Sequence, residues 1–144
     1  MHKVLTVGTF DLFHSGHITL LENCQKYSGI DGIIVVGLNT DRFVSTFKNP
    51  TIYSFQERIK ILSSCRYVDR VIENDSQCLK SMLIYVKPDY LIVGSDWAPP
   101  RDYVKQIGTT ELWLAEHGIK LVFIPRSEDS QSSSKIREAV IANG

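Results

Sequence analysis

Near the N-terminus, the stretch GTFDLFHSGH, residues 8–17, places two histidines and two glycines directly after an apolar run. His14 and His17 lie at the expected start of a helix, where unpaired backbone N–H groups and the helix dipole favour a phosphate. Gly16 lacks a Cβ that would obstruct a phosphate, and Gly8 permits an unusual backbone angle at the strand end. Two imidazoles can donate hydrogen bonds to charge that develops during in-line displacement at phosphorus, so the pattern indicates phosphoryl-type transfer.

A structural explanation competes with this interpretation. One histidine of an isolated pair would cap the helix and the other would pack inside the protein. The neighbouring Thr9, Phe10 and Asp11, together with both glycines, favour the chemical interpretation, because the motif is specific only as a whole.

Three consecutive serines near the C-terminus form a second candidate anion-binding site. Ser132, Ser133 and Ser134 lie at the start of the last expected helix, where hydroxyls and exposed N–H groups can bind an anion. An ordinary capped terminal helix would have the same appearance.

Basic side chains could complete a site for a polyphosphate. Arg126 follows the fifth expected strand and Arg66 precedes the third, and the arginine fork suits phosphate oxygens. Either arginine could instead pair with a carboxylate. Lys48 lies in a long expected loop, where it is a candidate triphosphate contact or a solvated lysine.

Two carboxylates and one tryptophan also belong to the candidate site. Asp11 and Asp96 could orient a hydroxyl, bind a metal-held water or cap a helix. Trp97 could stack on a base or line the acceptor pocket, but large aromatic side chains mostly serve cores. Gly94 precedes this pair at the end of a strand.

Short apolar runs alternate with amphipathic segments along the whole chain. The expected strands span residues 3–8, 32–38, 67–72, 89–94 and 120–125, and the expected helices 16–28, 54–65, 76–86, 102–118 and 132–142. Continuous apolar runs are typical of strands covered on both faces. The order predicts one α/β domain over residues 1–144, with a five-stranded parallel sheet, helices on both faces and a loop at 44–54.

In such a sheet, ligands bind beyond the carboxyl ends of the strands, near the point where the strand order reverses. Polar and unusual residues of this sequence collect there. They follow the first, second, fourth and fifth strands, at residues 8–17, 39–41, 94–97 and 125–134.

Composition limits the function classes. Sixteen basic and sixteen acidic residues give zero formal charge, so the overall charge does not indicate binding to nucleic acid or membranes, and local groups must hold any anionic ligand. The three cysteines lack the spacing of a metal site, and Cys24 and Cys65 fall in helical patterns as near-core residues. The N-terminal apolar run is too short for a signal peptide, so we expect a cytoplasmic protein with reduced thiols.

The motif GTFDLFHSGH resembles the H-x-G-H signature of the nucleotidyltransferase superfamily, in its cytidylyltransferase form G-x-F-D-x-x-H-x-G-H. RYVDRVI at 66–72, GSDW at 94–97 and SSSKI at 132–136 resemble later blocks of that family, in the same order. The chain is most similar to the small glycerol-3-phosphate cytidylyltransferases. The segment GTTELWLAEHGIKLVFI is also similar to adenylyltransferase domains that act on heptose phosphates.

The resemblance implies a Rossmann-like, homodimeric enzyme that uses CTP and Mg²⁺. It implies transfer of CMP to a small phosphorylated alcohol, with no metal held by the protein alone. By resemblance, His14 and His17 act at the α-phosphate, Ser132 to Ser134 hold the outer phosphates, and Lys48 and Arg126 contact phosphates.

Two alternatives remain open. One is an adenylyltransferase that uses ATP on a sugar phosphate, since base contacts in such sites are mostly to the backbone. The other is a non-catalytic nucleotide sensor. The complete pair His14 and His17 disfavours it, because a protein that only binds a nucleotide would tolerate the loss of either histidine.

Overall fold

The computed structural model describes residues 1–125 of the chain. Its strands are β1 (Lys3–Gly8), β2 (Ile33–Asn39), β3 (Arg70–Asn74), β4 (Tyr90–Gly94) and β5 (Lys120–Ile124). Its helices are α1 (Ser15–Ser28), α2 (Asp41–Val44), α3 (Phe55–Ser63), α4 (Lys80–Val86), α5 (Tyr103–Gln106) and α6 (Glu111–Glu116), with a 3₁₀ turn η1 (Ser95–Trp97) after β4.

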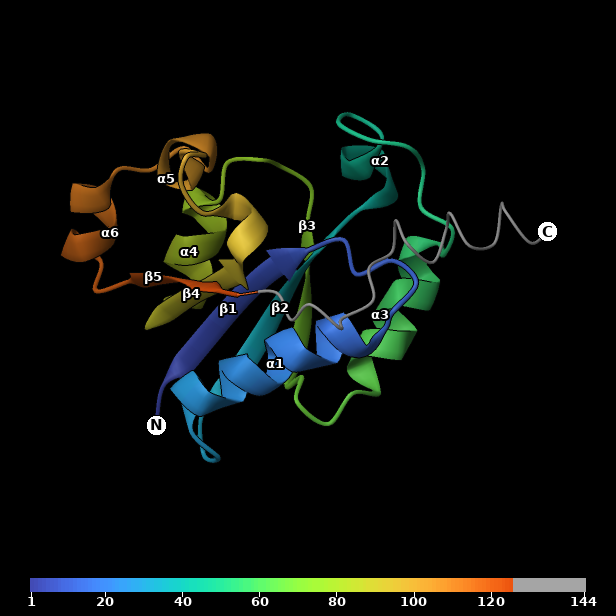
Figure 1. The fold of residues 1–144 in the computed structure, drawn as a ribbon, viewed down its shortest axis with the longest axis horizontal. Coiled ribbons are helices and arrows are strands. Elements are labelled where there is room, and N and C mark those ends of the chain that lie inside the picture. Colours follow the sequence, from blue (N-terminus) through green and yellow to red (C-terminus); the bar gives the residue numbers. More distant parts are fainter. Residues whose placement is uncertain (126–144) are drawn as a thin grey trace.

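All five strands are parallel and form one sheet in the order β3-β2-β1-β4-β5 (Figure 1). This confirms the predicted Rossmann-like α/β sheet. The chain moves outward from β1 to β3 and then returns to the other side of β1 at β4. The strand order therefore reverses beside β1, where parallel α/β sheets bind their ligands.

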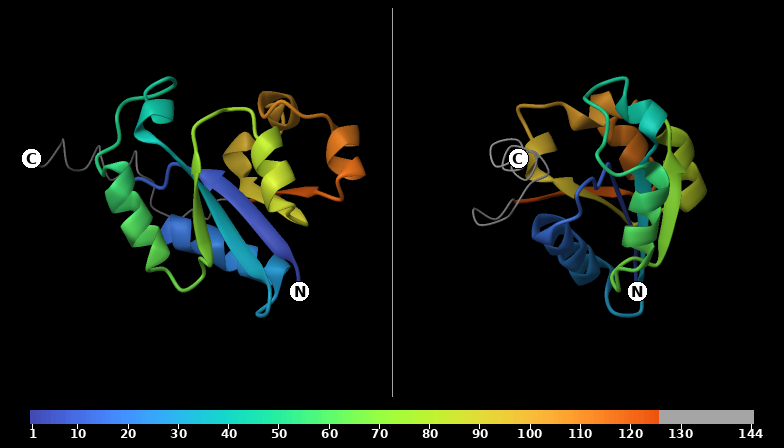
Figure 2. Two further views of the ribbon diagram at one scale, coloured as in Figure 1. Left: turned by 180° about the vertical axis from the view of Figure 1, so that it is seen from behind. Right: turned by 90° about the vertical axis from the view of Figure 1, so that its right-hand side faces the viewer.

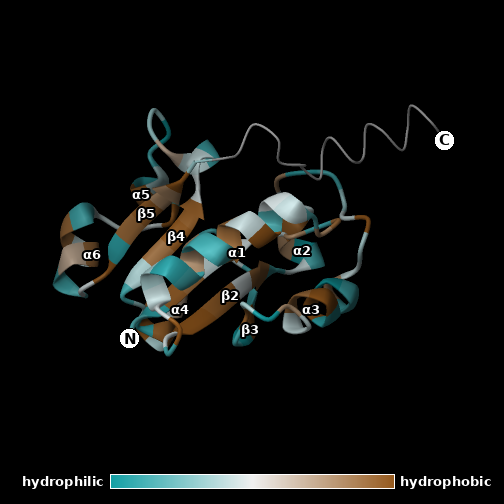
Figure 3. Ribbon diagram, turned by 60° about the horizontal axis from the view of Figure 1, so that its bottom comes forward, coloured by the Kyte–Doolittle hydropathy of each residue, from teal (hydrophilic) through white to brown (hydrophobic). Residues whose placement is uncertain are grey.

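Helices cover both faces of the sheet, as predicted. Helices α1 and α3 pack on one face, and α4, α5 and α6 pack on the other (Figures 1 and 2). Successive residues of β1 point to opposite faces of the sheet. Val4 belongs to the core under α1 and α3, and Leu5 belongs to the core under α4, α5 and α6. Strands β2 and β4 are hydrophobic over most of their length, whereas the edge strand β3 and the helices also carry hydrophilic residues (Figure 3).

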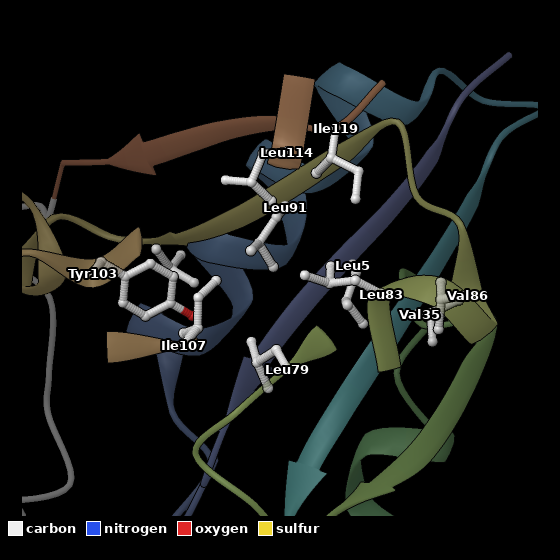
Figure 4. Close-up of a cluster of buried hydrophobic side chains, with 11 residues drawn as sticks. Leu5, Val35, Leu79, Leu83, Val86, Leu91, Tyr103, Ile107, Leu114 and Ile119 are labelled. Atoms are coloured by element: carbon white, nitrogen blue, oxygen red, sulfur yellow. The ribbon is translucent and has the colours of Figure 1, made fainter. Parts of the chain in front are cut away.

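The core under α4, α5 and α6 extends to the carboxyl edge of the sheet. Leu5, Leu83 and Leu91 are essentially inaccessible at its centre, and Tyr103 and Ile107 close it at the end nearest the carboxyl edge (Figure 4). Burying such side chains contributes about 1.5–3 kcal/mol each, so this core gives α5 a rigid base.

Three boundaries differ from the sequence prediction. Strand β3 begins at Arg70 rather than at residue 67, because residues 65–68 form a turn in which the Val68 N–H donates to the Cys65 carbonyl. The expected helix 102–118 is two short helices, separated at Gly108, whose φ of 77° is left-handed. A short helix, α2, precedes the loop that was expected over 44–54.

The predicted core positions of two cysteines are confirmed, since Cys24 is buried and Cys65 is half-buried, whereas Cys78 is exposed. Burial raises the pKa of the Cys24 thiol to about 12, so it stays protonated at neutral pH. Within residues 1–125, no helix has the length and apolar character needed to span a membrane.

Candidate active site

A cavity of about 660 Å³ opens at the carboxyl edge of the sheet. It lies where the strand order reverses, and its lining comes from the ends of β1, β2, β3, β4 and β5 together with the loops that follow them. The residues predicted from sequence that line it are Gly8, Thr9, Phe10, His14, Gly16, His17, Lys48, Gly94, Asp96 and Trp97.

The two histidines are fixed by the backbone of their own turn. The Gly16 N–H donates to His14 Nδ1 at 3.0 Å, and the His14 N–H donates to His17 Nδ1 at 3.1 Å. An imidazole nitrogen that accepts an N–H carries no proton, so the neutral form of each ring is protonated at Nε2. Both histidines line the cavity, and each can donate from Nε2 to an anionic oxygen there.

Ring packing holds the same geometry. The His14 and His17 rings stack with centroids 3.9 Å apart, and Phe13 stacks on His17 at 5.3 Å. Phe10 contacts His17 from a third direction, at 5.2 Å and with a tilted ring. Rotation of either imidazole would break both a stacking contact and a hydrogen bond, so the two donors are preorganised.

The unusual backbone angles fall on other residues than the sequence suggested. Gly8 does not have a positive φ, whereas Phe10 and Leu12 have φ values of 50° and 48°. A Cβ on Gly8 would lie 3.0 Å from the Phe10 ring, so glycine is required there for close approach. Non-glycine residues with positive φ collect at functional sites, and these two fix the path of the chain into the histidines.

A buried arginine joins the elements around the cavity. Arg58 on α3 is completely inaccessible to solvent. Its Nη1 donates to the Thr9 carbonyl at 2.9 Å and to the Asn39 carbonyl at 2.7 Å, and its Nη2 donates to Asp41 Oδ1 at 2.6 Å. A fourth hydrogen bond runs from Nε to the Tyr53 carbonyl at 3.2 Å. One guanidinium thereby ties the ends of β1 and β2 to α2 and to the loop before α3.

The carboxylate of Asp41 completes this network. It accepts the Phe55 N–H at 3.1 Å and the Thr51 hydroxyl at 3.2 Å as well as the Arg58 contact. Partial burial acts to raise the pKa of Asp41, but the hydrogen bonds and the charge of Arg58 outweigh it and hold that pKa below its usual value.

Asp11 also holds this loop, and it does not line the cavity. Its carboxylate accepts the Ile52 N–H at 2.8 Å and the Tyr53 N–H at 2.9 Å. The residue is 4% exposed, so the geometry favours a positioning role for Asp11 over direct contact with a nucleotide.

Lys48 and Trp97 lie at the mouth of the cavity. The Lys48 ammonium is exposed and lies 5.8 Å from the centroid of the Phe47 ring. Arg101 lies 4.9 Å from the centroid of the Trp97 ring, beside the exposed Asp96 on η1. The cavity therefore has a cationic group on each of two sides, Lys48 and Arg101, and the carboxylate of Asp96 lies on the same side as Arg101.

The structure does not bring Arg66 to this cavity. Arg66 is exposed before β3, at the opposite end of that strand from its carboxyl end, and its guanidinium donates to the Tyr67 hydroxyl at 2.8 Å. Its assignment to nucleotide binding has no support from this geometry. Arg126, Ser132, Ser133 and Ser134 lie outside the described residues.

The sequence interpretation missed Arg58 and the pair Asn39 and Asn74. Asn74 Nδ2 donates to Asn39 Oδ1 at 2.8 Å, and Asn39 Nδ2 donates to the Thr9 hydroxyl at 3.1 Å. A signal for Arg58 was present, because it falls on the apolar stripe of α3 that is formed by Phe55, Ile59 and Leu62. A charged residue at a core position of an amphipathic helix indicates a buried polar network.

Comparison with known proteins identifies relatives over nearly the whole chain. Residues 5–139 match the family described as "Cytidylyltransferase-like". The chain is 34% identical to the glycerol-3-phosphate cytidylyltransferase of Bacillus subtilis (strain 168), over 97% of this chain and 98% of that protein. It is 30% identical to the FAD synthase of Korarchaeum cryptofilum (strain OPF8), over 96% of this chain and 91% of that protein.

Two further similarities concern a larger protein and a solved structure. The chain is 34% identical to the bifunctional protein HldE of Desulfatibacillum aliphaticivorans, over 98% of this chain but 27% of that protein. The crystal structure of the lipopolysaccharide core biosynthesis protein from Thermoplasma volcanium GSS1 matches with a TM-score of 0.69 and 26% identity. That match covers 89% of this chain and 99% of the other.

Proposed function

This chain belongs to the cytidylyltransferase-like family of nucleotidyltransferases, and on that premise we propose that it transfers CMP from CTP to a small phosphorylated alcohol. Glycerol 3-phosphate represents the acceptor class, and the products are a CDP-linked alcohol and pyrophosphate. The observation that carries the proposal is the pair of imidazoles held as Nε2 donors at the cavity.

The reaction needs positioning and charge stabilisation more than a protein nucleophile. An oxygen of the acceptor phosphate attacks the α-phosphorus in line. The bond between that phosphorus and the bridging oxygen breaks, and pyrophosphate leaves with the bonding electrons. His14 and His17 donate from Nε2 to the α-phosphate oxygens, where charge changes most in the transition state. Lys48, Arg126 and Ser132 to Ser134 are proposed to hold the outer phosphates.

A divalent cation fits the donor set of this cavity. No group of three or more His, Cys, Asp or Glu side chains within residues 1–125 could hold a metal ion, and Asp96 is the one carboxylate among the described lining residues. Mg²⁺ is commonly held by one or two carboxylates and substrate phosphates, so Asp96 is the proposed protein ligand. When bound with the triphosphate, the cation would neutralise phosphate charge.

Adenylyl transfer from ATP is the second candidate. The similarities to an FAD synthase and to HldE proteins favour keeping it, because they are about as strong as the similarity to a glycerol-3-phosphate cytidylyltransferase. A non-catalytic sensor is less well supported, because these relatives are nucleotidyltransferases. We also propose that the chain acts as a cytoplasmic homodimer.

Pyrophosphate release from CTP and ATP, each with glycerol 3-phosphate, a heptose phosphate and FMN, tests the proposal. We expect release with CTP and glycerol 3-phosphate, dependent on Mg²⁺, and little with ATP. Efficient release with ATP alone would contradict the choice of nucleotide. Absence of release with every combination would contradict the enzymatic proposal.

A further inference from the structure

The cavity extends to both sides of the histidines, which follow the central strand β1. On one side lie the ends of β4 and β5 with η1, and on the other lie the end of β3 and the loop to α4. Given the proposed function, the acceptor phosphate must lie beside the α-phosphate at the histidines. If the nucleotide takes the side of Gly94 to Trp97, the carbon chain of the acceptor extends toward β3.

On the side toward β3, the end of β3, the loop to α4 and α5 contribute uncharged polar residues, while Lys48 lines the cavity from the loop after α2. Asn74, Ser76 and Gln77 come from the end of β3 and the following loop, and Gln106 comes from α5. We call these four residues the amide wall. The loop and the end of α5 are joined, because Gln77 Nε2 donates to the Gln106 carbonyl at 3.1 Å and the Leu79 N–H donates to the Ile107 carbonyl at 3.0 Å.

The hydrogen bonds of the amide wall fix which atoms remain for a ligand. Asn74 Nδ2 is used by Asn39, and Gln77 Nε2 is used by Gln106. The side-chain carbonyl oxygens of Asn74 and Gln77 therefore remain to accept hydrogen bonds, and each amide keeps a second N–H to donate. A surface that offers both donors and acceptors suits hydroxyl groups, which also donate and accept.

Tyr103, which precedes Gln106 on α5 and contacts Trp97 on η1, adds a hydroxyl where the amide wall meets the side of Gly94 to Trp97. The residue lines the cavity and is 6% exposed. Among residues 1–125 its hydroxyl has no hydrogen-bond partner, and its ring packs on Trp97 and Phe123. In that part of the chain, Thr6 Oγ1 is the one fully enclosed side-chain oxygen or nitrogen without a partner. The Tyr103 hydroxyl therefore keeps access to solvent, at a residue that lines the cavity.

Because the Tyr103 hydroxyl has no partner within residues 1–125 and keeps access to solvent, a ligand group can bind it without breaking a hydrogen bond in that part of the protein. Burial raises the pKa of the Tyr103 phenol, so the group stays protonated and can donate as well as accept. It is a neutral recognition group beside neutral amides.

We propose that the amide wall and Tyr103 form the subsite for the body of the acceptor, and that this acceptor is a phosphorylated straight-chain polyol longer than glycerol 3-phosphate. Five polar residues line this part of the cavity, whereas glycerol 3-phosphate has two free hydroxyls. A polyol of four or five carbons supplies enough hydroxyls to reach Tyr103. The subsite deepens the proposed function and rests on it for the position of the transferred phosphate.

The experiment measures kcat/KM for CTP-dependent pyrophosphate release with glycerol 3-phosphate, erythritol 4-phosphate and ribitol 5-phosphate. We expect the wild-type value to rise about tenfold from the shortest to the longest acceptor. Tyr103→Phe should lower the value for ribitol 5-phosphate about tenfold and that for glycerol 3-phosphate less than about twofold. The KM for CTP should be unchanged.

Thermal stability separates recognition from a structural role. Tyr103→Phe removes no hydrogen bond within residues 1–125, so its melting temperature should equal or exceed that of the wild type. Tyr27→Phe is the matched control, because Tyr27 is half-buried against Tyr90 and does not line the cavity. It should leave all three acceptors unaffected.

Each outcome bears on one proposal. Equal losses for all acceptors in Tyr103→Phe, or a lower melting temperature without a change in acceptor preference, would overturn the subsite. If no acceptor releases pyrophosphate, the proposed function fails, and calorimetric titration of ribitol 5-phosphate into the protein tests the subsite alone. Binding that weakens in Tyr103→Phe would support the subsite, and absence of binding would overturn it.

Discussion

Two regions border the cavity and are held in different ways. The histidine turn, residues 8–17, is held by contacts between residues two to seven positions apart, such as the hydrogen bond from the Gly16 N–H to His14 Nδ1. The second half of the loop at 45–54 is held by residues far away in the sequence. Asp11 binds its backbone 41 and 42 positions away, and Arg58 joins it to Thr9, 49 positions away.

This difference indicates different roles for the two regions: the histidine turn supplies the donors for the reaction, and the long-range contacts position the loop beside the cavity. Within the histidine turn, hydrogen bonds and ring contacts between nearby residues fix the tautomer and the orientation of both imidazoles. The loop contributes Phe47 and Lys48 to the cavity. Their N–H groups donate to the Val44 carbonyl at the end of α2, so their position depends on α2 and on the long-range contacts that hold α2 and the second half of the loop. Changes in the turn should therefore affect turnover first, and changes in the long-range network should affect stability and loop position first.

Loss of an imidazole donor should have the largest effect. His14→Asn and His17→Asn each keep a side-chain acceptor near the position of Nδ1, which accepts a backbone N–H at the start of α1, but the shorter amide places no donor at the position of Nε2. We expect each to lower kcat about a hundredfold, on the order of 3 kcal/mol in the barrier, with a much smaller change in CTP affinity. Turnover and nucleotide titration on the same preparations measure both.

His117→Ala is the matched control, because His117 is exposed at the end of α6 and does not line the cavity. Its kcat should stay at the wild-type value. Normal turnover in folded His17→Asn would contradict the catalytic role, and equal losses of affinity and turnover would leave the histidines a binding role only.

Loss of the buried guanidinium should have the next largest effect. Arg58→Ala leaves the carbonyls of Thr9, Asn39 and Tyr53 without a donor and Asp41 without its cation. The Asp41 side chain is 53% exposed and can be rehydrated, so we expect a loss of about 2–3 kcal/mol in the free energy of unfolding. Urea denaturation measures it, and trypsin should cleave after Lys48 faster than in the wild type.

Lys60→Ala on the exposed face of the same helix serves as the control, with an expected change of less than about 0.5 kcal/mol. A loss of similar size in both variants would mean that α3 tolerates little change anywhere. Unchanged cleavage after Lys48 in Arg58→Ala would show that the loop is held without the arginine.

The same contrast explains which parts could be predicted from the sequence. The parallel sheet and its flanking helices follow from local apolar runs and their alternation, and the histidine turn follows from a contiguous motif. The roles of Arg58, Asn39 and Asn74 depend on hydrogen bonds across 19 to 49 residues of sequence, which no local pattern specifies.

The exact ends of strands and helices were harder to predict from the sequence than their presence, for a related reason. The apolar residues Val68 and Tyr67 look like the start of a strand, yet they pack into the core from a turn that precedes β3. Asp11 looked like a ligand because it lies inside the motif, but its burial and its two backbone contacts make it a support for the loop.

The smallest expected effect is a pH dependence of the long-range network. The pKa of Asp41 is lowered in the folded protein, so the group binds fewer protons there than in the unfolded chain, where its pKa is about 3.9. Its contribution to stability is therefore complete above about pH 5 and is lost as the pH falls through the folded pKa. The carboxylate is exposed and screened by solvent, so we expect the contribution to be at most about 1 kcal/mol.

Free energies of unfolding between pH 3 and pH 6, for the wild type and for Asp41→Asn, measure this contribution. The difference between the two proteins should be largest at pH 6 and should shrink toward pH 3, because protonation of Asp41 removes the charge that the substitution also removes. In an Arg58→Ala background, Asp41→Asn should change stability little at any pH, because the partner that lowers the pKa is absent. A difference that persists unchanged at pH 3, or that survives the loss of Arg58, would mean that Asp41 acts through its contacts to Thr51 and the Phe55 N–H instead of through the buried arginine.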